Sequence, residues 1–92
     1  MKPFDWSPEK NRLLIQQRGV SFEAIVAHIE AGGLIAVVPG QGKYRHQKQL
    51  IVWVDSYVYV VPCVEDEQKF FLKTIIPSRK LTRKYLSGGG PQ

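Results

Sequence analysis

The sequence predicts an α+β domain in which two N-terminal helices pack on a four-stranded, mostly antiparallel sheet that is followed by a short C-terminal helix. Three features support this prediction. The first third of the chain has the capping residues and the apolar spacing of two helices. From residue 34 onward, β-branched and aromatic residues recur in short runs typical of strands. At Pro77 the last of these runs meets a strongly basic segment that has a helix-capping serine at its start.

The first helix is predicted over residues 8–17. Ser7 is a preferred N-cap residue, because its hydroxyl can accept a hydrogen bond from a backbone N–H of the first turn. Pro8 suits the first helical position, and Gly19 stops the helix because glycine readily adopts the left-handed conformation of a helix end.

A second helix begins directly afterwards, with Ser21 as its N-cap. Its apolar residues recur at i, i+3, i+4 and i+7 and form a single stripe, made of Phe22, Ile25, Val26 and Ile29. Such a stripe predicts a helix face that packs into the core. The glycine pair at positions 32 and 33 ends this helix.

Four strands are predicted, over residues 34–38, 48–54, 57–64 and 69–76. The turns between the last three strands are short, so these strands pair as antiparallel hairpins. Alternation assigns one face of the sheet to Leu50, Val52, Tyr57, Tyr59, Val61, Cys63, Phe70, Leu72 and Thr74. It assigns the other face to Ile51, Trp53, Val58, Val60, Phe71, Lys73 and Ile75. Both faces are largely apolar, so we expect a homo-oligomer or a hetero-oligomer in which a partner covers what the helices do not.

The size of the chain, 92 residues of which 43% are hydrophobic, corresponds to one small domain. We place this domain over residues 1–86 and a flexible, Gly-rich tail over residues 87–92. The apolar runs are much shorter than the roughly 20 residues that a membrane-spanning helix needs. The N-terminus lacks a signal-peptide core, and a single cysteine cannot form an internal disulfide. We therefore expect a cytoplasmic protein without membrane contact.

The formal net charge of +5 favours a polyanionic partner such as nucleic acid or an acidic protein. The sequence has no spacing typical of a metal site, since His28 and His46 are far apart and Cys63 is alone in an apolar segment. It also lacks the glycine-rich phosphate loops and the GxSxG elbow of nucleotide-dependent enzymes and serine hydrolases. We expect neither a metal nor a cofactor.

Two basic clusters remain, over residues 43–48 and 79–84. The first contains Tyr44 and the second is followed directly by Tyr85. Cations beside tyrosine are the composition of a single-stranded RNA site, where cations bind phosphates and aromatic rings stack on bases. With Lys73 of the last strand, the candidate RNA-binding residues are Lys43, Tyr44, Arg45, Lys48, Lys73, Lys80 and Lys84. We expect the C-terminal cations to converge with the central connection in one pocket for ribose-phosphate.

RNA cleavage by the 2′-OH needs a proton acceptor, a proton donor and fixed cations for the charge on the phosphate. Arg79 and Arg83 suit the third role, because guanidinium groups bind phosphates through two hydrogen bonds. The candidates for moving protons are His46 and Tyr85, with Tyr44 and Glu65 also near the clusters in sequence. Each of these four has a structural alternative, either packing or exposure in a solvated loop.

Three segments carry a resemblance to a known family: Trp6-Ser7-Pro8-Glu9-Lys10-Asn11-Arg12, Arg18-Gly19-Val20-Ser21-Phe22-Glu23 and Ile75-Ile76-Pro77-Ser78-Arg79-Lys80-Leu81-Thr82-Arg83-Lys84. In their order and content the chain resembles the BrnT family of type II toxins. The resemblance implies a compact RelE-like fold and a bacterial ribonuclease that inhibits translation. It also implies a cognate antitoxin, usually a small DNA-binding protein, as the partner.

The resemblance places Arg79 on the arginine of the family's Ser-Ala-Arg segment, and Lys80 and Arg83 on the basic residues that follow it. The chain departs from the family at Arg18, where a histidine is usual, and at Tyr85, where an acid is frequent. Positions 72 and 74, often basic in relatives, are Leu72 and Thr74 here. Two alternatives to a metal-independent endoribonuclease stay open. One is a non-catalytic RNA-binding or protein-interaction module on the same scaffold, and the other is a structural partner whose basic face docks an acidic protein.

Overall fold

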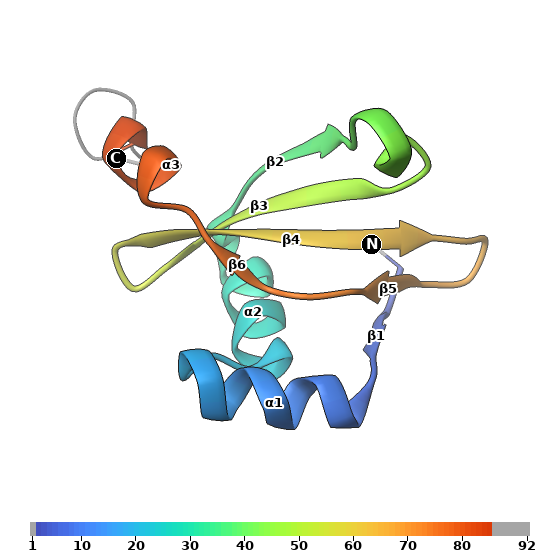
Figure 1. Ribbon diagram of the computed structural model, residues 1–92, viewed down its shortest axis with the longest axis horizontal. Helices are drawn as coiled ribbons and strands as arrows, with labels where there is room; N and C mark the ends of the chain where they lie inside the picture. The colour runs from blue at the N-terminus through green and yellow to red at the C-terminus, as the bar shows by residue number, and fades with distance from the viewer. Residues whose placement is uncertain (1, 86–92) are drawn as a thin grey trace.

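The structure is a computed structural model that describes residues 2–85. In chain order its elements are β1 (Phe4–Trp6), α1 (Pro8–Arg18), α2 (Phe22–His28), η1 (Ile29–Gly33), β2 (Leu34–Pro39), η2 (Gly42–Tyr44), β3 (Lys48–Val54), β4 (Tyr57–Glu65), β5 (Phe70–Leu72), β6 (Ile76–Pro77) and α3 (Arg79–Lys84). Figure 1 shows α1 and α2 on one side of the sheet and α3 on the other. The tail predicted over residues 87–92 lies outside the described residues, as does Leu86.

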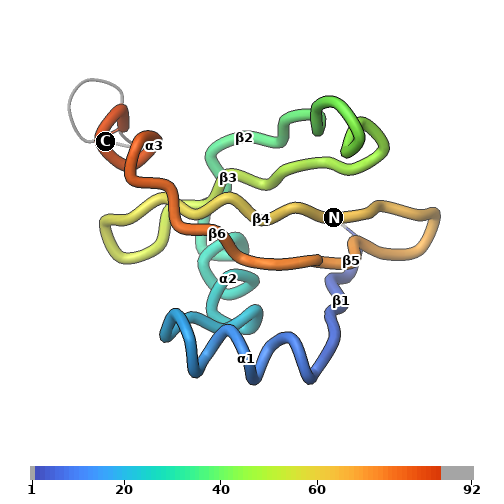
Figure 2. The backbone as a smooth tube through the Cα atoms, viewed as in Figure 1, coloured from blue at the N-terminus to red at the C-terminus, as the bar shows by residue number. Residues whose placement is uncertain are grey.

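The strands form one mixed, six-stranded sheet in the order β1-β5-β4-β3-β2, with β6 paired to β4. The α+β class is therefore confirmed, but the prediction of four mostly antiparallel strands is wrong in two respects. β1 is an additional edge strand that pairs in parallel with β5. The strand predicted over residues 69–76 is divided into β5 and β6, both antiparallel to β4. Figure 2 shows the chain passing from β5 through β6 to α3.

β1 was not predicted, because its 3 residues are too few to show the alternation of a strand. It is held in place by contacts with the distant segment around β5. Phe4 lies opposite Phe70, and the two rings stack with 5.6 Å between their centroids. The Lys69 ammonium donates a hydrogen bond of 2.8 Å to the Asp5 carboxylate. Only the folded chain brings these residues together.

A β-bulge between β5 and β6 moves Ile75 to the face opposite the predicted one. Leu72 lies opposite Cys63 and Ile76 lies opposite Val60, so the β5–β6 segment has one residue more than β4 over this stretch. An extra residue reverses the alternation that follows it. Ile75 is consequently fully buried in the core, at 0% exposure.

The core lies between the two N-terminal helices and the first face of the sheet, which we define by Leu50, Val52, Val61, Cys63 and Leu72. The predicted assignment of these five side chains to one face is confirmed. They pack with the apolar stripe of the helices, made of Leu14, Phe22, Ile25 and Ile29. The second face carries Gln49, Ile51, Val58, Val60 and Pro62, whose register positions alternate with those of the first face.

The helix starts follow the capping residues. The Ser7 hydroxyl accepts a hydrogen bond from the Lys10 N–H at 3.3 Å, and α1 ends at Gly19, whose φ of 66° is left-handed. α1 is also joined to the rest of the chain by its polar residues. The buried Asn11 amide donates to the Glu23 carboxylate at 2.7 Å and accepts from the Phe22 N–H at 2.8 Å. These bonds tie α1 to the first turn of α2. Within residues 2–85, no helix has the length and apolar character needed to cross a membrane.

Candidate nucleic-acid interface

The basic residues of α3 line a shallow hollow of about 520 Å³, which we call the basic hollow: Arg79, Lys80, Arg83 and Lys84. Arg79 and Arg83 are one turn apart, as are Lys80 and Lys84, so all four cations lie on one side of the helix. All four are exposed. Among residues 2–85, these four side chains are the lining of the hollow, and none of them is acidic. The clustered like charges repel one another, so binding of an anion here is favoured.

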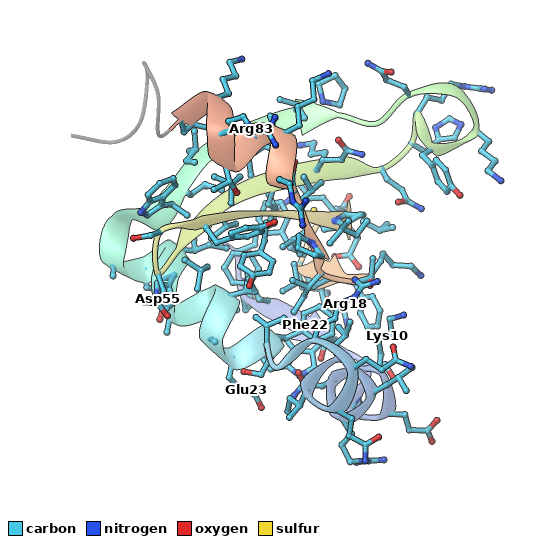
Figure 3. The ribbon with its side chains drawn as sticks, turned by 60° about the vertical axis from the view of Figure 1, so that its left-hand side comes forward. Lys10, Arg18, Phe22, Glu23, Asp55 and Arg83 are labelled. Carbon is cyan, nitrogen blue, oxygen red and sulfur yellow. The ribbon has the colours of Figure 1, made fainter. Side chains whose placement is uncertain are left out.

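The other side of α3 is fixed on the sheet by hydrogen bonds to Val58 of β4. The Ser78 N–H donates to the Val58 carbonyl at 2.9 Å, which extends the pairing of β6 by one residue. The Thr82 hydroxyl accepts from the Val58 N–H at 2.8 Å and donates to the Ser78 carbonyl at 2.7 Å. Thr82 is only 6% exposed. The basic side of α3 is thereby held outward, on the side of β4 that lies away from α1 and α2 (Figure 3).

Thr82→Val tests this attachment, because it removes the hydroxyl while nearly preserving the shape of the side chain. We expect the free energy of unfolding to fall by about 1–3 kcal/mol, the cost of leaving the buried Val58 N–H without an acceptor. The measurement is urea unfolding, together with hydrogen exchange of the Val58 amide. Thr82→Ser is the matched control, since it keeps the hydroxyl. Equal stability of the Val and Ser variants would contradict the proposed role of this bond.

A second hollow, the sheet hollow, lies on the second face of the sheet and has a volume of about 330 Å³. Its floor comes from β3, β4 and the β5–β6 segment, and one wall comes from the loop between β2 and β3. The lining includes Tyr44, Gln47, Gln49, Pro62, Lys73 and Thr74. The predicted RNA-binding residues Tyr44 and Lys73 are thus brought together. Thr74 was expected on the first face, and the bulge after Leu72 explains its position here.

A third hollow, the Glu65 hollow, contains His46 and Lys48 together with the acidic turn after β4. The Glu65 carboxylate is paired on both sides, by Lys2 at 2.8 Å and by Lys48. The hydrogen bond from Lys2, followed by that from Lys48, lowers the pKa of Glu65 to about 2. A carboxylate with so low a pKa is a weak base, so Glu65 is poorly suited to accept a proton at neutral pH.

The paired Glu65 predicts a defined loss of stability in acid. The pKa of Glu65 is about 2 in the folded protein, against an ordinary value of 4.5, so its contribution is complete above pH 4.5. That contribution is lost as the pH falls from about 4.5 towards 2. Glu65→Gln should therefore flatten the fall in urea midpoint between pH 6 and pH 3. Glu67→Gln is the control, since Glu67 is exposed in the same turn and forms no ion pair within residues 2–85. Identical pH profiles for wild type and Glu65→Gln would contradict this assignment.

The two basic clusters do not share a pocket within residues 2–85. The basic hollow contains residues of α3 alone, whereas Tyr44 lies in the sheet hollow and His46 in the Glu65 hollow. Figures 1 and 3 both show α3 apart from the loop that contains η2. Tyr85 caps α3, with its ring centroid 5.7 Å from the Lys84 ammonium, but it does not line the basic hollow. The expectation of one convergent pocket is not met.

The remaining cations of the loop are exposed. The Lys43 ammonium lies 5.2 Å from the centroid of the Tyr44 ring, and Arg45 is exposed beside it.

Two residues of the sheet hollow, Gln47 and Gln49, were missed by sequence reasoning. The available signal was Gln49, a polar residue directly before the apolar run of β3, whose alternation places it on the second face.

Burial raises the pKa of the Cys63 thiol, which is fully buried, so a nucleophilic role is disfavoured. Among residues 2–85, His, Cys, Asp and Glu side chains form no group of three or more that could hold a metal ion. Metal independence of any reaction stays a prediction.

No model of a known protein family matches the chain, and no curated protein matches it.

Proposed function

We propose that this protein is the toxin of a bacterial type II toxin–antitoxin system and acts as a metal-independent endoribonuclease that inhibits translation. The observation that carries the proposal is the basic hollow, which is lined by four cations on one side of α3. Such a surface suits the phosphates of a single RNA strand. The resemblance of the chain to the BrnT family supports the assignment to this class, including a RelE-like fold, a cytoplasmic location and an antitoxin as partner.

In this proposal Arg79 and Arg83 hold the scissile phosphate and stabilise the charge that develops as the 2′-OH attacks it. Lys80 and Lys84 hold the neighbouring phosphates. The sheet hollow lies on the same side of the sheet as α3. In this proposal the bound RNA strand therefore extends from the basic hollow into the sheet hollow, where it reaches Lys73. The sequence offers His46 or Tyr85 as the proton-transfer group. Tyr85 directly follows the basic residues of α3, whereas His46 lines the separate Glu65 hollow, so this proposal assigns the role to Tyr85.

One observation favours a second candidate, a non-catalytic RNA-binding module. None of the residues that line the basic hollow beside Arg79 and Arg83 is a candidate for proton transfer. Lysine and arginine cations offer hydrogen-bond donors to a phosphate but no acceptor for the proton of the 2′-OH. On this alternative the protein binds RNA through the same hollow and blocks translation, or contacts a partner, without cleaving the strand.

Cleavage of RNA by the purified protein separates the two candidates. We expect free or ribosome-bound RNA to be cut in the presence of EDTA, to leave 2′,3′-cyclic phosphate ends, and to resist cleavage where the attacking ribose is replaced by deoxyribose. RNA binding with a steep salt dependence but no cleavage would support the binding module. Absence of both binding and cleavage would overturn the proposal. For the partner, we expect the product of the neighbouring reading frame to form a complex with this protein and to restore translation.

A further inference from the structure

The sheet hollow has a composition that the binding of phosphate alone does not explain. Within residues 2–85, Lys73 is the one charged lining residue, and the rest of the lining is aromatic, amide, hydroxyl and apolar. Tyr44 is 50% exposed and presents a ring to solvent. Its volume of about 330 Å³ is near the lower limit for small-molecule sites, roughly 300–1,000 Å³. The hollow therefore has the size for one nucleotide.

Hydrogen bonds within the loop hold this hollow in shape. The Gly40 N–H donates to the Gln47 carbonyl at 2.9 Å, and the Gln47 N–H donates to the Tyr44 carbonyl at 2.8 Å. A side chain at Gly40 would come within 2.1 Å of the Tyr44 carbonyl oxygen, so the chain passes closely here. The backbone at Tyr44 and Gln47 is thus fixed before any ligand arrives, which lowers the entropic cost of binding.

The two glutamine side chains supply hydrogen-bonding groups that no side-chain hydrogen bond among residues 2–85 uses. Among residues 2–85, neither the Gln47 amide nor the Gln49 amide has a side-chain hydrogen bond. Gln49 projects from β3 on the second face, beside Pro62 of the neighbouring strand β4. An amide offers one acceptor and one donor side by side, which matches the N6 donor and N7 acceptor of adenine.

We propose that the sheet hollow binds one adenine base of single-stranded RNA, which makes it a specificity subsite of the proposed function, on which this inference rests. Tyr44 stacks on the base, as aromatic side chains do on unstacked RNA bases. The amides of Gln47 and Gln49 read its polar edge. Lys73, at the rim, binds the adjoining phosphate, while α3 binds phosphates further along the strand.

Binding to four RNA pentamers tests the inference. Each pentamer is a uridine chain with A, G, C or U at its centre, and binding is measured by fluorescence anisotropy at two salt concentrations. We expect the A-centred pentamer to bind roughly five- to a hundredfold more tightly than the others, the discrimination of one bidentate contact. Gln47→Leu and Gln49→Leu should each reduce this preference to below about threefold without changing the salt dependence. Gln41→Leu, in the same loop but outside the hollow, is the control and should keep the preference.

Two further measurements separate failure of this subsite from failure of the proposed function. In the first, AMP alone is added to wild type and to Gln49→Leu, and the chemical shift of the Gln47 side-chain amide, which both proteins contain, is followed by NMR. Shifts in wild type alone support an adenine site even if no pentamer binds, in which case only the RNA function fails. In the second, Tyr44→Leu should weaken binding of every pentamer, because stacking tolerates all bases. Equal affinity for all four centres, or AMP shifts that survive in Gln49→Leu, would overturn the subsite while leaving the basic hollow unaffected.

Discussion

The Arg79→Gln, Arg83→Gln double variant is expected to lose RNA cleavage by at least about 100-fold, the usual effect of removing a group that stabilises charge in the transition state. Its affinity for single-stranded RNA should fall roughly 10- to 100-fold at low salt, since each lost contact is a charge-assisted hydrogen bond at an exposed position. Removing two phosphate contacts should also reduce the slope of log affinity against log salt by about 1.4. Both residues are exposed, so the fold should persist.

The matched control is Lys10→Gln, Arg12→Gln, which removes two positive charges from α1 on the other side of the sheet. This control has the same net charge as the test variant but leaves the basic hollow intact. We expect it to weaken RNA binding by less than about threefold, through the general field of the protein alone. Anisotropy titrations at several salt concentrations and gel assays of cleavage give both quantities. Equal losses in the two double variants would show that net charge, and not the basic hollow, determines binding.

The largest expected effect on stability is that of Phe22→Ala. Phe22 is fully buried between the helices and the sheet (Figure 3), and its ring stacks on Trp6 with 5.7 Å between centroids. Truncation of a buried phenylalanine costs about 3–5 kcal/mol, because transfer energy is lost and a cavity remains. Small domains have only about 5–15 kcal/mol in total. We therefore expect the midpoint of thermal unfolding to fall by roughly 12 °C or more.

Phe22→Leu and Ile15→Ala complete this experiment. Leucine keeps most of the buried volume, so Phe22→Leu should fold even if the alanine variant does not, at a cost of about 1–2 kcal/mol. Ile15 lies on the outer side of α1 and is 48% exposed, so Ile15→Ala should change stability by less than about 0.5 kcal/mol. Circular dichroism during heating and urea titration measures all three. The role given to Phe22 would be refuted if its alanine variant were as stable as Ile15→Ala.

Helix starts were predictable because caps act over three residues. Ser7 accepts from Lys10, as Ser21 accepts from Ala24 at 3.0 Å. These bonds need nothing from the rest of the chain. The same holds for α3, whose N-cap Ser78 accepts from the Leu81 N–H at 3.2 Å. The cationic side of α3 was likewise evident, since the spacing of its basic residues fixes their neighbours on a helix.

Strand alternation was reliable only while the register was regular. It placed the side chains of β3 and β4 correctly, because the two-residue turn at Asp55 and Ser56 keeps both strands in step. Both turn residues have positive φ, 50° and 68°, as the tight hairpin turn requires. No residue type in the segment before Ile75 signals the bulge, so the burial of Ile75 could not be predicted from the sequence. Neither could β1, whose partner strand is distant in sequence.

The sequence by itself determined the α+β class, the starts of the helices, most of the core and the basic side of α3. Each depends on residues that are close along the chain, whose geometry follows from the helical or strand period. Tertiary structure alone decided that α3 and the central loop line separate hollows, that Glu65 is held between two lysines, and that Gln47 and Gln49 line one hollow with Lys73. The physical reason is that sheet order and a one-residue bulge set these distances, and both arise from packing between segments far apart in sequence.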